Sequence, residues 1–303
     1  MSRANDHSKR FVFLGASGRI GRLLRAVWSD AKDTELCIDW QFRTPQRTMQ
    51  NTLIWPNLAE LEPFLQYSKS VGGVDGLFVF LGGTGAGNKA DVEYLATNVS
   101  LVDQALHAAV LAKIPRVVIA SSSAVYGAGQ GVPFDENSSL NPVNAYGEVK
   151  RDMEAMAVAR AADYGIEVCI LRIGNVAGAD ALLGSAEGWR SGDMPRRLDV
   201  YPDGDGPRRS YIGPKSLADV LRCLALQPQP LPQVVNVAAP IAVSMNALLD
   251  AARIDWERRS VPASPVQDIV LDCGRLASLS GINVRDGTAT ALVAQWRSAL
   301  GAL

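Results

Sequence analysis

Apolar residues follow two alternating patterns along most of the chain. Compact apolar runs, typical of strands buried on both faces of a parallel sheet, lie at 11–14, 76–81, 116–120, 166–172 and 233–237. Strands are also predicted at 35–42 and 51–55, and helices at 22–28, 57–69, 90–112, 149–164 and 287–303, while 216–226 is expected to return the chain to the main sheet. Strands that alternate with helices predict an α/β fold, a doubly wound parallel sheet with right-handed crossovers.

A glycine-spaced turn joins the first strand to the first helix. Its first glycine permits a sharp turn, its second lets backbone N–H groups approach a pyrophosphate, and its third lets the helix pack on the strand. The positive end of the helix then faces the anion. Glycines also occur in ordinary tight turns, but here they predict a dinucleotide site. The expected contacts are Gly15, Ser17, Gly18, Arg19, Ile20 and Gly21.

The end of the second strand bears on which cofactor is bound. An acidic residue there would bind the ribose 2′-hydroxyl of NAD, whereas an arginine would neutralise the 2′-phosphate of NADP. Counting from Gly21 leads to Asp39. The alternation instead continues to Phe42 and places Arg43 at the tip, and a charge in mid-strand would be costly. We therefore favour Arg43 and NADP, with NAD as the alternative and a solvated loop arginine as the simpler interpretation of Arg43.

A second glycine cluster follows the strand at 76–81. Its small residues, 82–87, would let a flat group approach the carboxyl edge of the sheet, although a flexible loop would have the same composition. We expect cofactor contacts from Leu81, Gly82 and Gly83. The next predicted helix carries Asn98, another candidate cofactor residue, whose alternative is a buried polar bridge.

Serines and a tyrosine–lysine pair supply the candidate reacting groups. Ser121, Ser122 and Ser123 end a predicted strand, and Tyr146 and Lys150 open the next helix. Residues four apart share one face of a helix, so the pair can reach one ligand. A free phenol has a pKa of about 10, and a neighbouring cation lowers that pKa toward neutrality. A serine hydroxyl could donate to a substrate oxygen as charge develops there.

These stretches together resemble an extended short-chain dehydrogenase/reductase of the NAD-dependent epimerase/dehydratase family. The resemblance rests on GASGRIG at 15–21, SSSAVYG at 121–127 and YGEVK at 146–150, with weaker similarity at 171–178 and 209–212. It implies hydride transfer between C4 of a nicotinamide and a carbinol or carbonyl carbon, often of a nucleotide-linked sugar.

The resemblance also implies individual roles. The family's tyrosine is the acid/base, its lysine holds the nicotinamide ribose and lowers the tyrosine pKa, and its serine binds the reacting oxygen. These positions match Tyr146, Lys150 and Ser122, and Tyr146 and Lys150 would contact the cofactor as well. Ser123 is the alternative to Ser122; otherwise Ser121 and Ser123 are expected to bond backbone. The implied substrate-binding residues are Ser122, Ser123, Asn175 and Arg209.

The C-terminal part departs from the family pattern. Arg209 matches an arginine that can bind a substrate diphosphate, although a surface ion pair is its alternative. Ala177 replaces an aromatic residue, and Gly213 and Ser216 replace a histidine and an aspartate. An NADPH-dependent carbonyl reductase with a non-sugar substrate is therefore an alternative. A non-catalytic dinucleotide-binding sensor or scaffold is the alternative of a different class.

We expect two regions in the chain. Residues 1–173, with return segments at about 213–240, would form a dinucleotide-binding Rossmann domain. Residues 174–212 and 241–303 would form a small C-terminal substrate-binding annex, because 179–209 shows little periodicity. The family resemblance also allows a homodimer, formed through the helix at 149–164 and the helix that carries Asn98.

Composition narrows the partners. The 303 residues carry a net charge of -1 with no basic stripe, so we expect no nucleic acid. No signal core begins the chain and no apolar run could span a bilayer, so we expect no membrane. The four cysteines are typical of buried free thiols in a reducing cytosol: Cys37, Cys169, Cys223 and Cys273. With two histidines, a zinc site or Ser–His–Asp triad is not expected. We expect a cytoplasmic protein with a small-molecule substrate and no metal.

Overall fold

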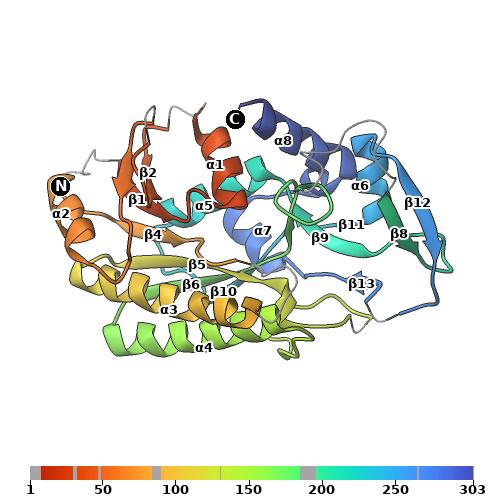
Figure 1. Cartoon of the computed structure of the whole chain (residues 1–303), viewed down its shortest axis with the longest axis horizontal. Coiled ribbons are helices and arrows are strands. Elements are labelled where there is room, and N and C mark those ends of the chain that lie inside the picture. Colours follow the sequence, from red (N-terminus) through yellow and green to blue (C-terminus); the bar gives the residue numbers. More distant parts are fainter. Residues whose placement is uncertain are drawn as a thin grey trace.

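The computed structural model describes residues 8–29, 33–46, 49–83, 90–129, 131–184, 196–264 and 266–302. A seven-stranded sheet runs through the molecule (Figure 1). Its strands are β1 (Lys9–Leu14), β2 (Leu36–Phe42), β3 (Thr52–Ile54), β4 (Gly76–Val79), β5 (Arg116–Ser122), β6 (Glu167–Ile173) and β10 (Val234–Val237). They lie in the order β10-β6-β5-β4-β1-β2-β3, and all neighbours are parallel. The predicted doubly wound α/β sheet is confirmed.

Helices cover both faces of this sheet. One face packs against α1 (Arg19–Ser29), α5 (Pro214–Leu226) and α7 (Gly274–Ser280), and the other against α2 (Glu62–Ser70), α3 (Ala90–Leu111) and α4 (Ala145–Tyr164). In Figure 1, α3 and α4 lie side by side below the sheet. Phe11 and Phe13 enter the first core, whereas Val12 and Leu14 enter the second. Burial on both faces explains the continuous apolar runs of these strands.

The clearest difference from the predicted elements is the start of α2. The helix was expected from Asn57, but 57–60 form a turn instead. The Asn57 side-chain oxygen accepts from the Ala59 N–H at 3.1 Å, and the Trp55 indole donates to the Glu60 carbonyl at 2.8 Å. Because an asparagine side chain can satisfy a local backbone N–H in this way, it favours a turn over a helix. The helix therefore begins at Glu62.

Two smaller sheets are built from the chain beyond β6. One contains β7 (Asn175–Val176), β9 (Arg208–Ile212), β11 (Ala242–Ser244) and β13 (Asp268–Ile269); the other pairs β8 (Arg196–Val200) with β12 (Trp256–Ser260). They gather at one end of the molecule with α6 (Met245–Ala252) and α8 (Ala289–Gly301) (Figure 1). These elements lie within the ranges expected for the annex. The division into two domains stays a prediction.

Two further sequence expectations concern membrane helices and cysteines. No helix in the described part of the chain is long and apolar enough to cross a bilayer. All four cysteines are free thiols. Cys169 and Cys273 are buried as expected, whereas Cys37 and Cys223 are only partly buried.

Candidate active site

The glycine turn after β1 is packed closely against the neighbouring strand. Gly15 has a φ of +98°, and a Cβ there would lie 2.3 Å from the carbonyl oxygen of Phe80. A Cβ on Gly21 would lie 2.4 Å from the carbonyl oxygen of Gly15. The N–H of Gly18 donates to the same carbonyl at 3.0 Å and closes the turn. The backbone itself thus requires glycine at the first and third positions.

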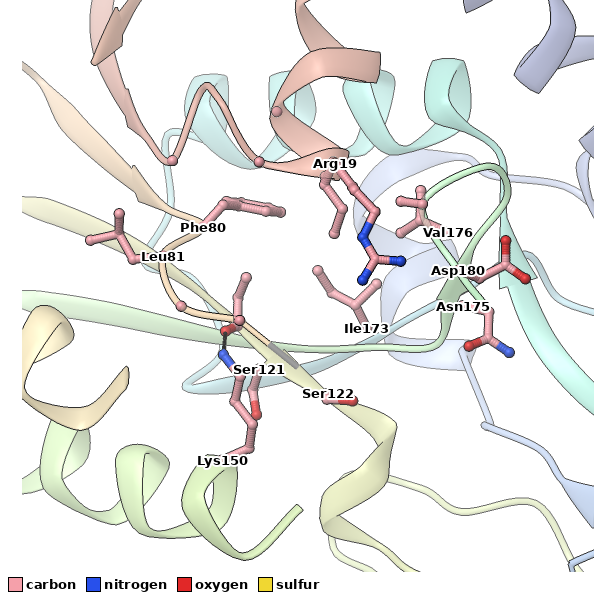
Figure 2. Close-up of a pocket in the computed structure, with 18 of the residues that line it drawn as sticks. Arg19, Phe80, Leu81, Ser121, Ser122, Lys150, Ile173, Asn175, Val176 and Asp180 are labelled. Atoms are coloured by element: carbon pink, nitrogen blue, oxygen red, sulfur yellow. Dashed lines mark hydrogen bonds between the residues drawn. The ribbon is translucent and has the colours of Figure 1, made fainter. Parts of the chain in front are cut away.

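A cavity of about 370 Å³ opens between this turn and the carboxyl ends of β4, β5 and β6. In Figure 2, Arg19 reaches into it from the start of α1, while Lys150 and Ser121 lie on the opposite side. The cavity brings together most of the predicted site residues: Gly15, Gly18, Arg19, Ile20, Gly21, Leu81, Gly82, Gly83, Ser122, Tyr146, Lys150 and Asn175. Ligands of doubly wound sheets bind at this edge.

Five predicted residues do not line the cavity: Ser17, Arg43, Asn98, Ser123 and Arg209. Asn98 lies behind the wall, where its side chain accepts from the Gly83 N–H and donates to the Gly83 carbonyl, both at 3.1 Å. It therefore fixes the second glycine segment as a buried polar bridge. Residues 84–87 of that segment lie outside the described residues.

Arg209 is engaged with backbone carbonyl groups. Its guanidinium donates to the carbonyl oxygens of Arg208, Val266 and Gln267, each at 2.7 Å. Burial lowers the pKa of Arg209. The surface ion pair considered for this residue is not what the structure shows. Its contact with a substrate stays a prediction.

Tyr146 lies in the first turn of α4 and faces the end of β5. Asn144 caps this helix, and its side-chain oxygen accepts from the Gly147 N–H at 2.9 Å. Tyr146 and Ser122 both line the cavity. Burial raises the pKa of the Tyr146 phenol, and the neighbouring Ser122 side chain opposes that shift. The phenol is therefore protonated at neutral pH, with a proton available to donate.

Lys150 follows Tyr146 by one helical turn and is only 4% exposed. Its Nζ donates to the carbonyl oxygen of Ala120 at 2.8 Å and lies 6.0 Å from the centre of the Tyr146 ring. Burial lowers the pKa of Lys150 to about 8, and the charge of Glu154 opposes that shift. At pH 7 the ammonium group is thus still charged and faces the same cavity as the phenol.

Asp39 and Arg43, the two residues considered for distinguishing NAD from NADP, lie at different places relative to strand β2. Asp39 lies inside the strand, is 1% exposed, and pairs with Arg10 at 2.7 Å. The strand ends at Phe42, and Arg43 follows it as an exposed residue. The placement of Arg43 at the tip is as expected, and the buried charge of Asp39 is compensated by a cation. Which nicotinamide cofactor binds stays a prediction.

A buried ion pair behind the cavity is absent from the sequence-based predictions. The Ser121 hydroxyl donates to the Glu154 carboxylate, so the expectation that Ser121 bonds backbone is wrong. Arg172 pairs with the same carboxylate at 2.8 Å. An arginine within the apolar run of β6 signals such a partner, because a buried cation needs a counter-ion. Glu154 lies one helical turn beyond Lys150, where that partner could have been sought.

Asp180 also lines the cavity without having been predicted. It accepts from the Tyr211 hydroxyl at 2.9 Å and from backbone N–H groups of its own turn. Burial raises the pKa of Asp180, and these hydrogen bonds oppose the shift. Its place depends on how the chain turns after β7, for which the sequence pattern offers no signal.

Residues 12–238 match the model of the NAD dependent epimerase/dehydratase family. The chain belongs to this family. A UDP-glucose 4-epimerase of Lactobacillus helveticus is 38% identical over 121 residues, which cover 39% of this chain and 36% of that enzyme. The matched part thus spans about a third of that relative's length.

Solved structures share the fold of this chain. MoeE5 in complex with UDP-glucuronic acid and NAD superposes with a TM-score of 0.75 at 22% identity, covering 98% of this chain and 100% of MoeE5. UDP-glucose 4-epimerase from Brucella ovis in complex with NAD gives a TM-score of 0.76 at 18% identity, covering 95% of this chain and 97% of the enzyme.

The residues present fit a dinucleotide. Gly15 and Gly21 let the turn pack without a Cβ at these two positions, and α1 begins within it, at Arg19. On the other side, Gly82 has a φ of +94°, and a Cβ there would lie 2.2 Å from the side-chain oxygen of Asn98. Two closely packed glycine segments therefore lie side by side at the edge of the cavity, and their backbone can approach a flat, anionic cofactor.

Proposed function

We propose that this protein is an NAD(P)-dependent epimerase or oxidoreductase that acts at a hydroxyl-bearing carbon of a nucleotide-linked sugar. The observation that carries the proposal is the shared cavity of Tyr146, Ser122 and Lys150 with the glycine turn. A protein that only sensed or scaffolded a dinucleotide would have no use for a phenol, a serine hydroxyl and a buried ammonium group in the same cavity.

Tyr146 would move the proton in this reaction. In the oxidation direction, the deprotonated form of Tyr146, which the raised pKa makes the minor form at neutral pH, would accept the proton of the substrate hydroxyl, while Ser122 donates to the same substrate oxygen. A bound nicotinamide cofactor would supply the hydride acceptor for the same carbon, so that loss of the proton and the hydride leaves a carbonyl group. In the reduction direction Tyr146 returns the proton. Lys150 stabilises the phenolate, and its remaining N–H groups can bind a ribose hydroxyl.

The cofactor would lie with its pyrophosphate on the glycine turn and its nicotinamide end toward Tyr146. Arg43, exposed beyond the tip of β2, is the candidate partner of a 2′-phosphate, and we therefore favour NADP. NAD is the alternative, since the related structures of MoeE5 and the Brucella ovis enzyme contain NAD.

The substrate class rests on the family. The curated relative acts on UDP-glucose, and MoeE5 binds UDP-glucuronic acid. Asn175 and Asp180 line the cavity beyond Ser122 and are the nearest candidates for contacts with sugar hydroxyls. A diphosphate could bind Arg209 only if its guanidinium released the carbonyl groups of Val266 and Gln267.

The proposal is tested by incubating the protein with UDP-glucose and either NAD or NADP, and measuring the epimeric product. A Tyr146→Phe variant should bind the cofactor with unchanged affinity and lose turnover by at least about 100-fold, as expected for loss of an acid/base. Tyr164→Phe, at the end of the same helix, is the matched control and should remain active. Full turnover by Tyr146→Phe would refute the assignment of the acid/base.

An NADPH-dependent carbonyl reductase with a non-sugar substrate is the second candidate. It is supported by Arg43 at the strand tip and by the carbonyl contacts of Arg209, which leave no diphosphate partner preformed there. A reductase exchanges its cofactor at each turnover, whereas an epimerase retains it. Steady oxidation of NADPH by small ketones, without epimerisation of UDP-glucose, would favour the reductase.

A further inference from the structure

The carboxylate of Glu154 is the centre of a buried polar cluster below the cavity floor. Glu154 is 4% exposed and Arg172 is 6% exposed. Arg172 donates to both oxygens of the carboxylate, from Nε at 3.1 and 3.2 Å and from Nη2 at 2.8 Å. The Ser121 hydroxyl donates to the same carboxylate from the cavity wall. A buried carboxylate with this many donors is fixed in place.

Lys150 shares a helix face with Glu154 and is equally buried. Its only hydrogen bond of ordinary length in the described part of the chain is the one to the Ala120 carbonyl, at 2.8 Å. The cluster thus joins two consecutive residues at the end of β5 to α4: Ala120 bonds Lys150, and Ser121 bonds Glu154. Figure 2 shows Lys150 reaching toward the strand beside Ser121.

We propose that Glu154 is a positioning residue whose carboxylate holds the Ser121 hydroxyl and keeps Lys150 cationic against the opposing charge of Arg172. The inference rests on the proposed function and deepens it, because it assigns the group that keeps Lys150 charged beside Tyr146. Its deciding measurement, the titration of Lys150, needs no substrate.

Glu154 is the neighbouring charge that acts on Lys150. On the elements packed against α4, the other described titratable or charged side chains are Asp103, His107, Arg116, Glu167, Cys169 and Arg172. Asp103 is paired with Arg160, and Arg116 with Glu167 at the opposite end of the strands. Arg172 also donates to the Tyr126 hydroxyl and to the backbone carbonyl of Glu136.

Two single variants should shift the Lys150 titration in opposite directions, and the double variant adds an intermediate case. Glu154→Gln removes the anion and leaves Arg172 as a like charge near Lys150, so Lys150 should release its proton at a lower pH, by about one unit or more. Arg172→Gln leaves the anion unopposed, so Lys150 should titrate at a higher pH. The double variant removes both charges and should lie between Glu154→Gln and the wild type.

The titration is measured by NMR on protein labelled at the ε-carbon of lysine. The chain has seven lysines, and a Lys150→Arg variant assigns the resonance. Glu148→Gln, an exposed carboxylate on the same helix, is the control and should leave the titration unchanged. The alkaline limb of turnover should move with the Lys150 titration in each variant. Replacement of Glu154 by Asp should restore most of the wild-type titration.

A purely structural ion pair would give another pattern. Both single variants would then be less stable, and the Lys150 titration would stay within a few tenths of a unit of the wild type or move in the same direction in both. Either pattern would overturn the proposal. If Glu154→Gln fails to fold, the test is made on Arg172→Gln. A Lys150 titration at the same pH as in the wild type, or at a lower pH, would then refute the proposal. Since the NMR result does not depend on catalysis, it remains decisive even if Tyr146→Phe refutes the proposed acid/base.

Discussion

Lys150→Met should stabilise the cofactor-free protein while it abolishes turnover. The pKa of Lys150 falls from 10.5 to about 8 because the ammonium group is buried. At about 1.4 kcal/mol per unit, this shift corresponds to roughly 3 kcal/mol by which folding disfavours the charged lysine at neutral pH. The variant also loses the hydrogen bond to the Ala120 carbonyl, which lowers its stability by about 1 kcal/mol. We therefore expect a net gain of about 2 kcal/mol at pH 7.

The gain should depend on pH with a definite sign. Below about pH 8 the lysine is protonated in both the folded and the unfolded protein, so the whole penalty is present. Between about pH 8 and 10.5 the folded protein releases its proton first, and the penalty decreases as the pH rises. Urea unfolding of the wild type and Lys150→Met at pH 7 and above pH 9 measures this difference, with Lys69→Met, an exposed lysine, as the control. A variant that is less stable than the wild type at pH 7 would refute the reasoning.

Three other substitutions test separate parts of the site. Gly15→Ala should weaken cofactor binding at least about tenfold and lower stability by about 2 kcal/mol or more, because its Cβ would meet the Phe80 carbonyl. The control is Gly72→Ala, which is also at positive φ but has open space around it. In a melting experiment this control should show only the smaller loss of stability that backbone strain causes. Arg43→Ala should weaken NADP binding by about 10- to 100-fold and leave NAD binding unchanged in a calorimetric titration, and equal effects on both would contradict the NADP preference. Asn144→Ala should cost about 1 kcal/mol in chemical denaturation by removing the cap of α4, and no loss would show that the cap is dispensable.

The parallel sheet was predictable because its signal is local. Strands buried on both faces have to be apolar throughout, and the helices between them have to be amphipathic, so β1, β4, β5 and β6 could be found from single segments. Tyr146 and Lys150 were predictable for the same reason, since helical spacing alone places them on one face. The start of α2 was not, because its position depends on the side-chain bonds of Asn57 and Trp55.

The site features that the sequence did not predict depend on contacts between distant segments of the chain. Glu154 and Arg172 meet across α4 and β6, and neither residue alone shows that its charge is buried. Asp180 reaches the cavity only through the turn after β7. Arg209 matches the family arginine by sequence, but the carbonyl groups it bonds include those of Val266 and Gln267, more than fifty residues further along the chain. Pairings of this kind are fixed by tertiary packing.

The most direct test of the central claim is an experimental structure of the protein with NADPH bound. We expect the pyrophosphate on the turn at Gly15–Gly21, the Tyr146 hydroxyl in the cavity beside the reactive face of the nicotinamide, and Lys150 within hydrogen-bond reach of the adjoining ribose. A cofactor bound with its nicotinamide remote from Tyr146, or a Lys150 directed away from the ribose, would contradict the account.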